Sequence, residues 1–350
     1  MDAITIGLDI AKSSFQLHGV NAAGAVVLRR KLPRSRVLEF FRGLAPAVVG
    51  IEACGASQHW AREIAALGHR VRLLSARAVK AYLPRQKNDA ADAAAICEAA
   101  GRPQLRDVPV KTPAQQAGLS VLRVRELLVK QRTMLVNALR GHLAEFGLVA
   151  PRGREGVSAL SELALDPAVP ALAQAACAAL VAQIEALEGQ ILSLEAQLRR
   201  RHAEDPLSQR LAEIPGIGLL GATALAVGTD PGRFRSGRDY AASLGLVPRQ
   251  NSTGGVERLG SISKMGDGRA RSLLAVGASA LLKRLRPRQG TPPAALAGSA
   301  LGSWALRLLE RKPWRVAMVA LANKLARVAW AVLTRGAGYC AEGGPVRAAA

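Results

Sequence analysis

The feature that most constrains the fold is a short run, residues 4–10, in which large apolar side chains occupy every second position. These positions are Ile4, Ile6, Leu8 and Ile10. Because the side chains of a strand point alternately to its two faces, this spacing predicts a strand with one face in a hydrophobic core. Asp9 falls on the other face, where we expect its carboxylate to be exposed. A single aspartate there is most often only solvated, so a function for Asp9 requires partners further along the chain.

The order of the elements that follow predicts the class of the first domain. Strands are predicted at 15–20, 25–31, 47–52 and 70–74, and helices at 35–44, at 57–67 with Ser57 as the N-cap, and after residue 74. The strand 47–52 is a continuous apolar run that ends in Glu52, a pattern typical of a strand buried on both faces. The resulting order, β-β-β-α-β-α-β-α, is that of an α/β RNase H-like domain.

Two more carboxylates open a later helix. Asn88 is the predicted N-cap of a helix that ends near Ala100, and residues three apart on a helix share a face, so Asp89 and Asp92 point together. The helix dipole alone also favours acidic residues in a first turn. Glu98, further along the same helix, is a spare candidate.

Together with Asp9 and Glu52, this helix would gather four carboxylates in one place. Such a cluster repels itself unless a cation offsets its charge, and oxygen ligands that leave coordination positions open suit Mg²⁺ or Mn²⁺. We therefore expect a metal site formed by Asp9, Glu52, Asp89 and Asp92, of the kind used in two-metal phosphoryl transfer.

The charge balance indicates the kind of partner. The 350 residues include 48 Lys and Arg against 26 Asp and Glu, for a net charge of +22. A polyanion is the expected partner, and a membrane surface is the competing interpretation. We find no uninterrupted apolar span or leader and expect no membrane, but a cytoplasmic protein that associates with the nucleoid when active. The four cysteines and five histidines show neither disulfide nor zinc spacing.

The middle of the chain is predicted to be helical. A long helix over 113–146 carries mostly positive charge, so Arg123 and Lys130 are candidate phosphate contacts, and a break follows at 147–156. Over 170–202, apolar residues recur in steps of three and four, as in the seam of a coiled coil. They are Cys177, Leu180, Ile184, Leu187, Ile191, Leu194 and Leu198. The seam could face the earlier helix or a second chain, and we favour self-association.

Two stretches near the C-terminus are candidates for nucleic-acid binding. Residues 211–218 contain Pro-Gly-Ile-Gly before a helical stretch, which has the shape of a helix-hairpin-helix, and the amides at Gly216 and Gly218 could receive a phosphate. Residues 245–267 place hydroxyls between glycines and cations, and Arg249, Arg258 and Lys264 could offset phosphate charge. A plain interhelical turn and a surface loop without chemistry are the alternatives.

These motifs, taken in order, resemble the DEDD-type transposases of bacterial insertion sequences. The family is the one numbered one hundred and ten, within it the eleven-eleven subgroup, and it is related to the Piv DNA invertases. The resemblance rests on Asp9, Glu52, Lys-Asn-Asp-x-x-Asp-Ala at 87–93, Pro-Gly-Ile-Gly at 215–218, Pro-Arg-Gln-Asn-Ser-Thr-Gly-Gly at 248–255, Ile-Ser-Lys-x-Gly-Asp at 262–267, and Leu-Ala-Asn-Lys-x-Ala-Arg-x-Ala-Trp at 321–330. It covers roughly 5–105 and 205–335, and the stretch 284–309 is the hardest part to place.

The resemblance implies a recombinase with a RuvC-like domain that holds a DEDD metal site, and a second domain that supplies a nucleophilic serine. The metal ligands transfer to Asp9, Glu52, Asp89 and Asp92, and the nucleophile to Ser252, with Thr253 as the adjacent alternative. The implied partners are donor and target double-stranded DNA and a structured guide, the bridge RNA. The implied domains are 1–105 (RuvC-like), 106–205 (basic helix, linker and α-helical coiled coil), 206–335 (mainly α-helical, with the serine) and 336–350 (tail).

Two other functions remain open from the residues alone. One is a RuvC-like, metal-dependent nuclease that resolves junctions with water as the nucleophile. The other is a non-catalytic nucleic-acid-binding protein whose carboxylates are only strand and helix ends. In the recombinase we expect a homo-oligomer, a dimer or a tetramer, in which Ser252 of one chain serves the carboxylates of another.

Overall fold

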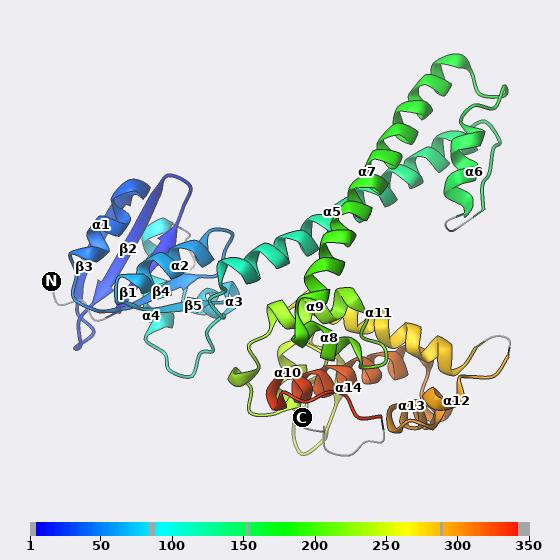
Figure 1. Ribbon diagram of the computed structural model, residues 1–350. Coiled ribbons are helices and arrows are strands. Elements are labelled where there is room, and N and C mark those ends of the chain that lie inside the picture. The colour runs from blue at the N-terminus through cyan, green and yellow to red at the C-terminus, as the bar shows by residue number, and fades with distance from the viewer. Residues whose placement is uncertain (1–4, 84–87, 152, 154, 288–289, 342–350) are drawn as a thin grey trace. The chain divides into compact units, whose positions relative to one another are not determined.

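The computed structural model describes residues 5–83, 88–151, 153, 155–287 and 290–341. Ile4 of the first predicted strand and Lys87 of the Lys-Asn-Asp motif lie outside these ranges. Contacts within the chain divide it into two units, Met1–Thr112 and Pro113–Ala350 (Figure 1). The predicted domain boundary at 205/206 falls inside the second unit and stays a prediction.

The first unit is built on a five-stranded mixed sheet (Figure 1). Its strands are β1 (Thr5–Ile10), β2 (Ser14–Val20), β3 (Val26–Pro33), β4 (Val48–Glu52) and β5 (Arg70–Leu74). The order across the sheet is β3-β2-β1-β4-β5. The pairs β1/β2 and β2/β3 are antiparallel, whereas β1/β4 and β4/β5 are parallel. This arrangement confirms the predicted element order and places β1 at the centre, with β4 beside it.

Helices follow the strands as predicted, with differences at their ends. They are α1 (Val37–Arg42) after a 3₁₀ turn (Arg34–Arg36), α2 (Ser57–Ala66), α3 (Ala76–Lys80) and α4 (Asp89–Ala100). The prediction that Ser57 caps α2 is wrong: the cap residue is Ala56 without a side-chain cap bond, and the Ser57 hydroxyl bonds the backbone of Cys54. Ser57 instead closes the turn between β4 and α2.

The core lies on one face of the sheet, and α4 covers part of the other. The core side chains include Ile6, Leu8, Phe15, Ile51 and Trp60. On the opposite face, a Cβ at Gly7 would lie 2.1 Å from the carbonyl oxygen of Ala93, so only glycine allows α4 to come this close. The Cys97 thiol donates a hydrogen bond to the carbonyl of Thr5 at 3.4 Å. The face on which Asp9 falls is therefore covered by a helix over much of its length.

A buried arginine holds the chain beyond α4 against the sheet. Arg72 of β5 is only 7% exposed. It pairs with Asp107 at 2.8 Å and donates hydrogen bonds to the carbonyls of Ala100, Arg102 and Leu105. Because a buried guanidinium is tolerated only when its donors are satisfied, these four partners fix the C-terminal end of α4 on β5.

The second unit begins with an antiparallel helical hairpin. It is formed by α5 (Pro113–Ala144) and α7 (Ala171–Ala203), with α6 (Glu155–Leu163) in the connection. Arg125 pairs with Glu195 at 2.6 Å and Arg132 with Glu188 at 3.3 Å. Residue numbers therefore rise along α5 while those of the partners on α7 fall, as in an antiparallel pair. Every seventh residue of the predicted seam is buried: Cys177, Ile184, Ile191 and Leu198. Of the two alternatives, the structure shows the intramolecular hairpin within one chain, and the preference for self-association stays a prediction.

The rest of the second unit is a helical domain with one short hairpin of strands. Its elements are α8 (Pro206–Ala212), α9 (Leu219–Gly228), a 3₁₀ turn (Pro231–Arg233), α10 (Gly237–Ser243), β6 (Pro248–Gln250), β7 (Leu259–Ile262), α11 (Gly268–Leu285), α12 (Ala294–Gly298), α13 (Ala300–Arg311) and α14 (Trp314–Arg335). The central helix is α14, whose Ala317, Leu321, Leu325 and Ala329 are fully buried (Figure 1). The stretch that was hardest to place, 284–309, contains α12 and most of α13.

Two helices, α7 and α14, are long and apolar enough to span a membrane by length and composition alone. The expectation that no segment meets this test is therefore wrong. In both helices the most buried side chains face other helices of the same unit: those of α7 face α5, and those of α14 lie in the core of the helical domain. Core helices pass the same test, so it is weak evidence for a membrane span.

Candidate active site

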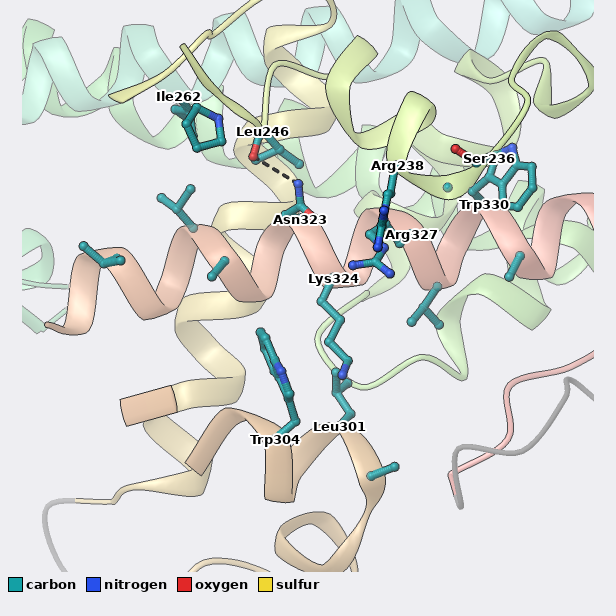
Figure 2. Close-up of a pocket in the computed structure, with 18 of the residues that line it drawn as sticks. Ser236, Arg238, Leu246, Ile262, Leu301, Trp304, Asn323, Lys324, Arg327 and Trp330 are labelled. Atoms are coloured by element: carbon teal, nitrogen blue, oxygen red, sulfur yellow. Dashed lines mark hydrogen bonds between the residues drawn. The ribbon is translucent and has the colours of Figure 1, made fainter. Parts of the chain in front are cut away.

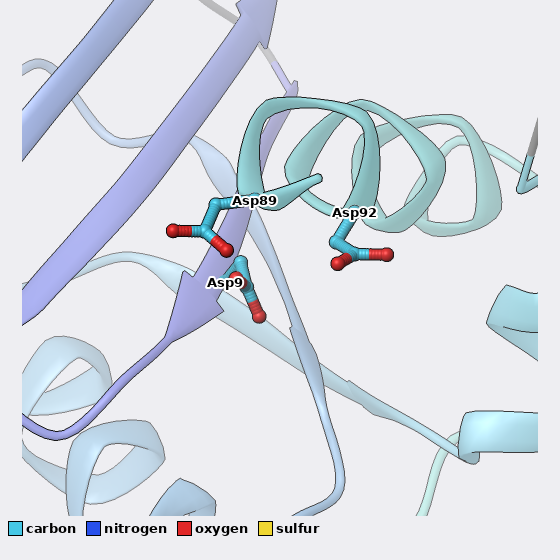
Figure 3. Close-up of side chains that lie close together, drawn as sticks. All are labelled: Asp9, Asp89 and Asp92. Carbon is cyan, nitrogen blue, oxygen red and sulfur yellow. The ribbon is translucent and has the colours of Figure 1, made fainter. Parts of the chain in front are cut away.

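Three of the four predicted metal ligands lie together in the first unit. Asp9 stands near the end of β1, and Asp89 and Asp92 stand in the first turn of α4 (Figure 3). Each can place one carboxylate oxygen so that the three oxygens all lie within 4.8 Å of one another. The cluster therefore brings Asp9 together with two aspartates that lie at least 80 positions further along the chain. It forms where the central strand meets the start of α4.

The local sequence explains why α4 begins here. The Asn88 side chain accepts a hydrogen bond from the backbone N–H of Ala91 at 2.8 Å, as expected of an N-cap. Asp89 and Asp92 then share one face of the first turn, and the positive end of the helix dipole partly offsets their charge. The cap and the pair predicted from sequence are confirmed as structural features.

The sequence predicts an exposed Asp9, but the structure shows that Asp9 is partly buried. Burial of the Asp9 carboxyl and, after it, the negative charges of Asp92, Asp89 and Glu52 together raise its pKa from 3.8 to about 6. The folded chain thus holds carboxylates so close together that one of them resists ionisation. A cation at this point would remove that penalty.

Glu52, the fourth predicted ligand, is placed next to the group of three. Leu8 pairs with Ile51 in the parallel ladder, and Asp9 and Glu52 follow directly on the two strands. Its charge contributes to the raised pKa of Asp9, although Glu52 is not one of the three residues whose oxygens lie within 4.8 Å. The spare candidate Glu98 of α4 is instead paired with Arg102, which lies two residues beyond the helix.

These residues fit a hard divalent cation. The ligand atoms are carboxylate oxygens, which Mg²⁺ and Mn²⁺ prefer, and three or four of them leave positions for water and a phosphate oxygen. The pKa of Asp9 is raised first by burial and then by the charges of the neighbouring carboxylates, so a cation at this point would offset negative charge. The donor set and its electrostatics therefore agree with a metal site.

The predicted nucleophile lies on a β-hairpin, which the sequence analysis does not predict. The strands β6 and β7 pair in antiparallel fashion, and Thr253 and Val256 close a turn whose central residues have positive φ angles, +56° at Gly254 and +78° at Gly255. Two glycines in this conformation are typical of tight hairpin turns. Ser252 is exposed, immediately before this turn.

The hairpin places one backbone donor at the Ser252 hydroxyl and carries two exposed arginines. The backbone N–H of Arg258 donates a hydrogen bond to the Ser252 hydroxyl oxygen at 3.3 Å, and the N–H of Asn251 donates to the carbonyl of Arg258. Such a donor stabilises negative charge on the oxygen, as develops when the hydroxyl loses its proton. Arg249, at the centre of β6, is exposed on the same hairpin, as is the side chain of Arg258.

Lys264 lies at the base of the hairpin in an unusual conformation. Its φ angle is 54°, the left-handed region that non-glycine residues rarely adopt. Its N–H donates to the carbonyl of Gly245, and a Cβ on Gly245 would lie 2.3 Å from the amide nitrogen of Met265. The chain is therefore held tightly at this point, with the Lys264 side chain exposed.

The other predicted nucleic-acid contacts are less concentrated. Gly216, with a φ of +93°, turns the chain between α8 and α9 and packs on the backbone of Gly277, while Gly218 is the exposed N-cap of α9. Arg123 and Lys130 are exposed on α5. Two other arginines of α5, Arg125 and Arg132, instead pair with carboxylates of α7 and so stabilise the α5–α7 helical hairpin. Phosphate contacts at Gly216, Gly218, Arg123 and Lys130 stay predictions.

Comparison with known proteins gives consistent matches in both units. A family model described as transposase, of the DEDD type of IS110 elements, matches residues 6–147. A second, described as the transposase IS116/IS110/IS902 family, matches residues 208–291. The first match includes all four predicted metal ligands, and the second includes Ser252.

Whole-length relatives agree with these matches. A protein of Pseudomonas aeruginosa named as a probable family 20 transposase is 47% identical over 96% of this chain and 98% of its own length. The transposase for insertion sequence element IS1328 of Yersinia enterocolitica is 38% identical over 95% of this chain and 97% of its own. The transposase for insertion sequence element IS1111A of Coxiella burnetii is 37% identical over 95% of this chain and 90% of its own.

Proposed function

The chain belongs to the IS116/IS110/IS902 family of transposases, and from this premise we propose that it is an RNA-guided recombinase that joins donor and target DNA through a phosphoserine intermediate. Residues 6–147 match the DEDD transposase domain of that family, and the RNase H-like sheet of the first unit, apart from its first residue Thr5, lies within this match. As a transposase it is an enzyme that recombines DNA. The metal ligands, the nucleophile and the guide are the finer points of the proposal.

The carboxylate cluster is the proposed metal-binding site. Asp9, Asp89 and Asp92, with Glu52 beside them, would hold Mg²⁺ or Mn²⁺ at the end of β1. When bound, such ions neutralise the charge of the scissile phosphate and polarise its phosphorus for attack. The carboxylates themselves position the ions, and the partial burial of Asp9 keeps the group from being fully solvated by water.

Ser252 is the proposed nucleophile, which forms the covalent bond to DNA. Its Oγ would attack the phosphodiester, so that the Oγ–P bond forms as the bond from phosphorus to the 3′ oxygen breaks. The proton of the serine hydroxyl is transferred, in net terms, to the departing 3′ oxygen. The Arg258 N–H, which already donates to Oγ, would stabilise its developing charge. Because the phosphoserine keeps the energy of the broken bond, a 3′ hydroxyl of the second DNA can reverse the step without ATP.

The charge of the chain supports a structured RNA as the reader of sequence. A net charge of +22 favours contacts to phosphate, which position nucleic acids but do not read their bases. A guide that pairs with both DNAs would supply the sequence recognition. The proposed partners are therefore donor and target duplexes, a bridge RNA and further copies of the chain, in the cytoplasm.

The exposed Ser252 at the hairpin turn is the observation on which the covalent mechanism depends, and adduct formation tests it. Labelled element-end DNA is incubated with protein, guide RNA and Mg²⁺, and covalent adducts are resolved on denaturing gels. We expect Ser252→Ala to abolish the adduct and Thr253→Ala to retain it, because only the former removes the attacking oxygen. An adduct that depends on Thr253 would move the nucleophile by one residue. Full cleavage by Ser252→Ala would instead favour a nuclease that uses water.

The guide is tested separately. Protein expressed together with the DNA that flanks its reading frame is purified, and the bound RNA is sequenced. We expect one structured transcript with segments complementary to the element ends and to the target. Joining of donor and target that persists in full after ribonuclease treatment would contradict the guide without affecting the serine mechanism.

A further inference from the structure

A cavity of the second unit lies beside the hairpin that carries Ser252. It has a volume of about 1340 Å³ and is bounded by α10, the β6–β7 hairpin, α13 and α14 (Figure 2). The hairpin contributes Pro248 and Ile262, among others, to its wall. The Asn323 side chain of α14 donates a hydrogen bond to the carbonyl of Leu246 at 3.1 Å and so fixes the start of the hairpin to this wall. We call this cavity the basic pocket.

The charged residues of the basic pocket are all positive. They are Arg238, Arg315, Lys324, Arg327 and Arg335, and no carboxylate occurs among the described residues that line it. Arg238 and Arg327 come from helices in direct contact, since a Cβ on Gly237 would lie 3.2 Å from the Cα of Arg327 (Figure 2). Partial burial and the charges of Arg327 and Arg307 lower the pKa of Lys324. Cations held together in this way favour an anionic ligand.

The floor of the pocket is apolar and contains an unusual share of the aromatic residues. The chain has only 4 Trp and 3 Tyr, yet Trp304, Trp330 and Tyr339 all line this pocket. The Lys324 ammonium lies 4.3 Å from the ring centroid of Trp304 (Figure 2). Aromatic residues make up only 3% of the chain, but three of them lie together at this pocket. The pocket can therefore receive a ligand that is both anionic and flat.

We propose that the basic pocket binds the unpaired DNA strand next to the phosphodiester that Ser252 attacks, with a base against Trp304 and phosphates on Arg238 and Arg327. This inference rests on the proposed function, because strand exchange requires the cut strand to leave its complement. Ser252 lies four residues beyond Pro248, about 13 Å along an extended strand, so one DNA strand can reach both.

The chemistry of the pocket favours this occupant over others. Duplex DNA presents phosphates but keeps its base faces stacked, so the aromatic floor would have no partner. An acidic peptide would match the cations but not a flat apolar surface. An unpaired strand supplies both phosphates for the cations and exposed base faces for the aromatic floor. Base–aromatic stacking together with phosphate contacts is the usual basis of single-strand binding.

The test measures binding of a short, fluorescently labelled single-stranded DNA to the full chain without divalent metal, so that no cleavage occurs. We expect Trp304→Ala and the double variant Arg238→Gln/Arg327→Gln each to weaken binding at least about fivefold. The double variant should also lower the slope of log affinity against log salt by about 1.4, the value for two lost single-strand phosphate contacts. Binding of the same sequence as a duplex should change less than twofold.

Two control variants separate this effect from charge and folding. Lys283→Gln/Arg284→Gln removes two exposed charges from α11, outside the pocket, and should change single-strand binding less than twofold. Trp304→Phe keeps a flat ring and should bind nearly as tightly as the wild type. Thermal denaturation of each variant verifies that it is folded. With 5-iodouracil in the strand, ultraviolet crosslinking should attach it to Trp304.

Several outcomes would overturn the proposal. Equal weakening of duplex and single strand would show a general electrostatic surface, and competition by poly-glutamate as effective as by DNA would indicate an acidic protein partner. A larger loss for single-stranded RNA than for DNA would assign the pocket to the guide. Because binding is measured without cleavage, these results are independent of whether Ser252 is the nucleophile.

Discussion

Gly7 of β1 lies opposite Gly50 of β4 in the parallel ladder, and α4 passes directly over both. A Cβ at Gly7 would lie 2.1 Å from the carbonyl oxygen of Ala93, and one at Gly50 would lie 2.5 Å from the Cβ of Ala100. Two adjacent glycines thus allow a helix to approach the sheet at backbone distance. This approach brings the first turn of α4, with its two aspartates, to the end of β1.

We expect Gly7→Ala to displace α4 and to disturb the metal site without changing any ligand. The added methyl group meets backbone atoms, which cannot rotate away, so the cost should be about 3 kcal/mol or more of unfolding free energy. Thermal denaturation with and without Mg²⁺ measures both effects. Gly43→Ala is the matched control, because the nearest atom to its Cβ is 3.7 Å away. A Gly7→Ala chain as stable as the control would contradict the close approach.

Cys97 is a second reporter of the same contact. Burial raises the pKa of its thiol to about 11, and its Sγ bonds the carbonyl of Thr5 beneath α4. A thiol reacts with alkylating agents as the thiolate, so Cys97 should resist iodoacetamide in the folded chain whereas the exposed Cys54 reacts. Mass spectrometry of the peptides measures each site. In Gly7→Ala, the alkylation rate of Cys97 should rise and that of Cys54 should stay constant.

Asp9 makes the effect of metal depend on pH. Its pKa of about 6 in the folded chain exceeds the ordinary value of 3.8, so the folded chain binds a proton that the unfolded chain releases. Without metal, this residue therefore lowers stability as pH rises through the range between the two values. A bound cation replaces the proton, so Mg²⁺ should raise the Tm more at about pH 8 than at about pH 5. Asp9→Asn should remove most of this difference. A Tm shift that is the same at both pH values would count against a metal at Asp9.

The packing of α7 on α5 can be tested with one buried and one exposed position of α7. Ile184 is 4% exposed in a cluster with Leu139 of α5, whereas Leu192 is 58% exposed. Ile184→Ala should cost about 2–5 kcal/mol and Leu192→Ala less than about 0.5 kcal/mol. Denaturation at several protein concentrations provides the check. A cost for Ile184→Ala that grows with dilution would mean that the seam joins two chains.

The sheet and the carboxylate cluster could be predicted from the sequence because their signals are local. Period-two alternation, a continuous apolar strand and the Asn88 cap each depend on a few neighbouring residues. The sequence did not reveal that Gly7 and Gly50 meet beneath α4, since this requires the register between two strands. For the same reason the exposure predicted for Asp9 was wrong: the helix that covers it lies 80 residues away.

The second unit was less predictable because its features depend on distant contacts. The heptad pattern of α7 predicts a partner helix but not whether the partner belongs to the same chain. The charge of α5 suggested phosphate contacts, yet Arg125 and Arg132 pair with α7. The double-glycine turn at Gly254 and Gly255 is a hairpin signal that the sequence interpretation did not use. The basic pocket gathers residues from four separated segments, which no local pattern predicts.

The last prediction concerns which chains supply the two halves of the active site. Asp9 belongs to the first unit and Ser252 to the second. If a homo-oligomer combines the carboxylates of one chain with the serine of another, two inactive variants can complement each other. Mixing Asp9→Ala protein with Ser252→Ala protein should then restore part of the strand transfer, because some mixed assemblies contain one site with intact carboxylates and an intact serine. Product formation is measured after co-assembly, with different affinity tags to verify mixing. Tagged mixtures as inactive as either variant alone would place both halves in the same chain.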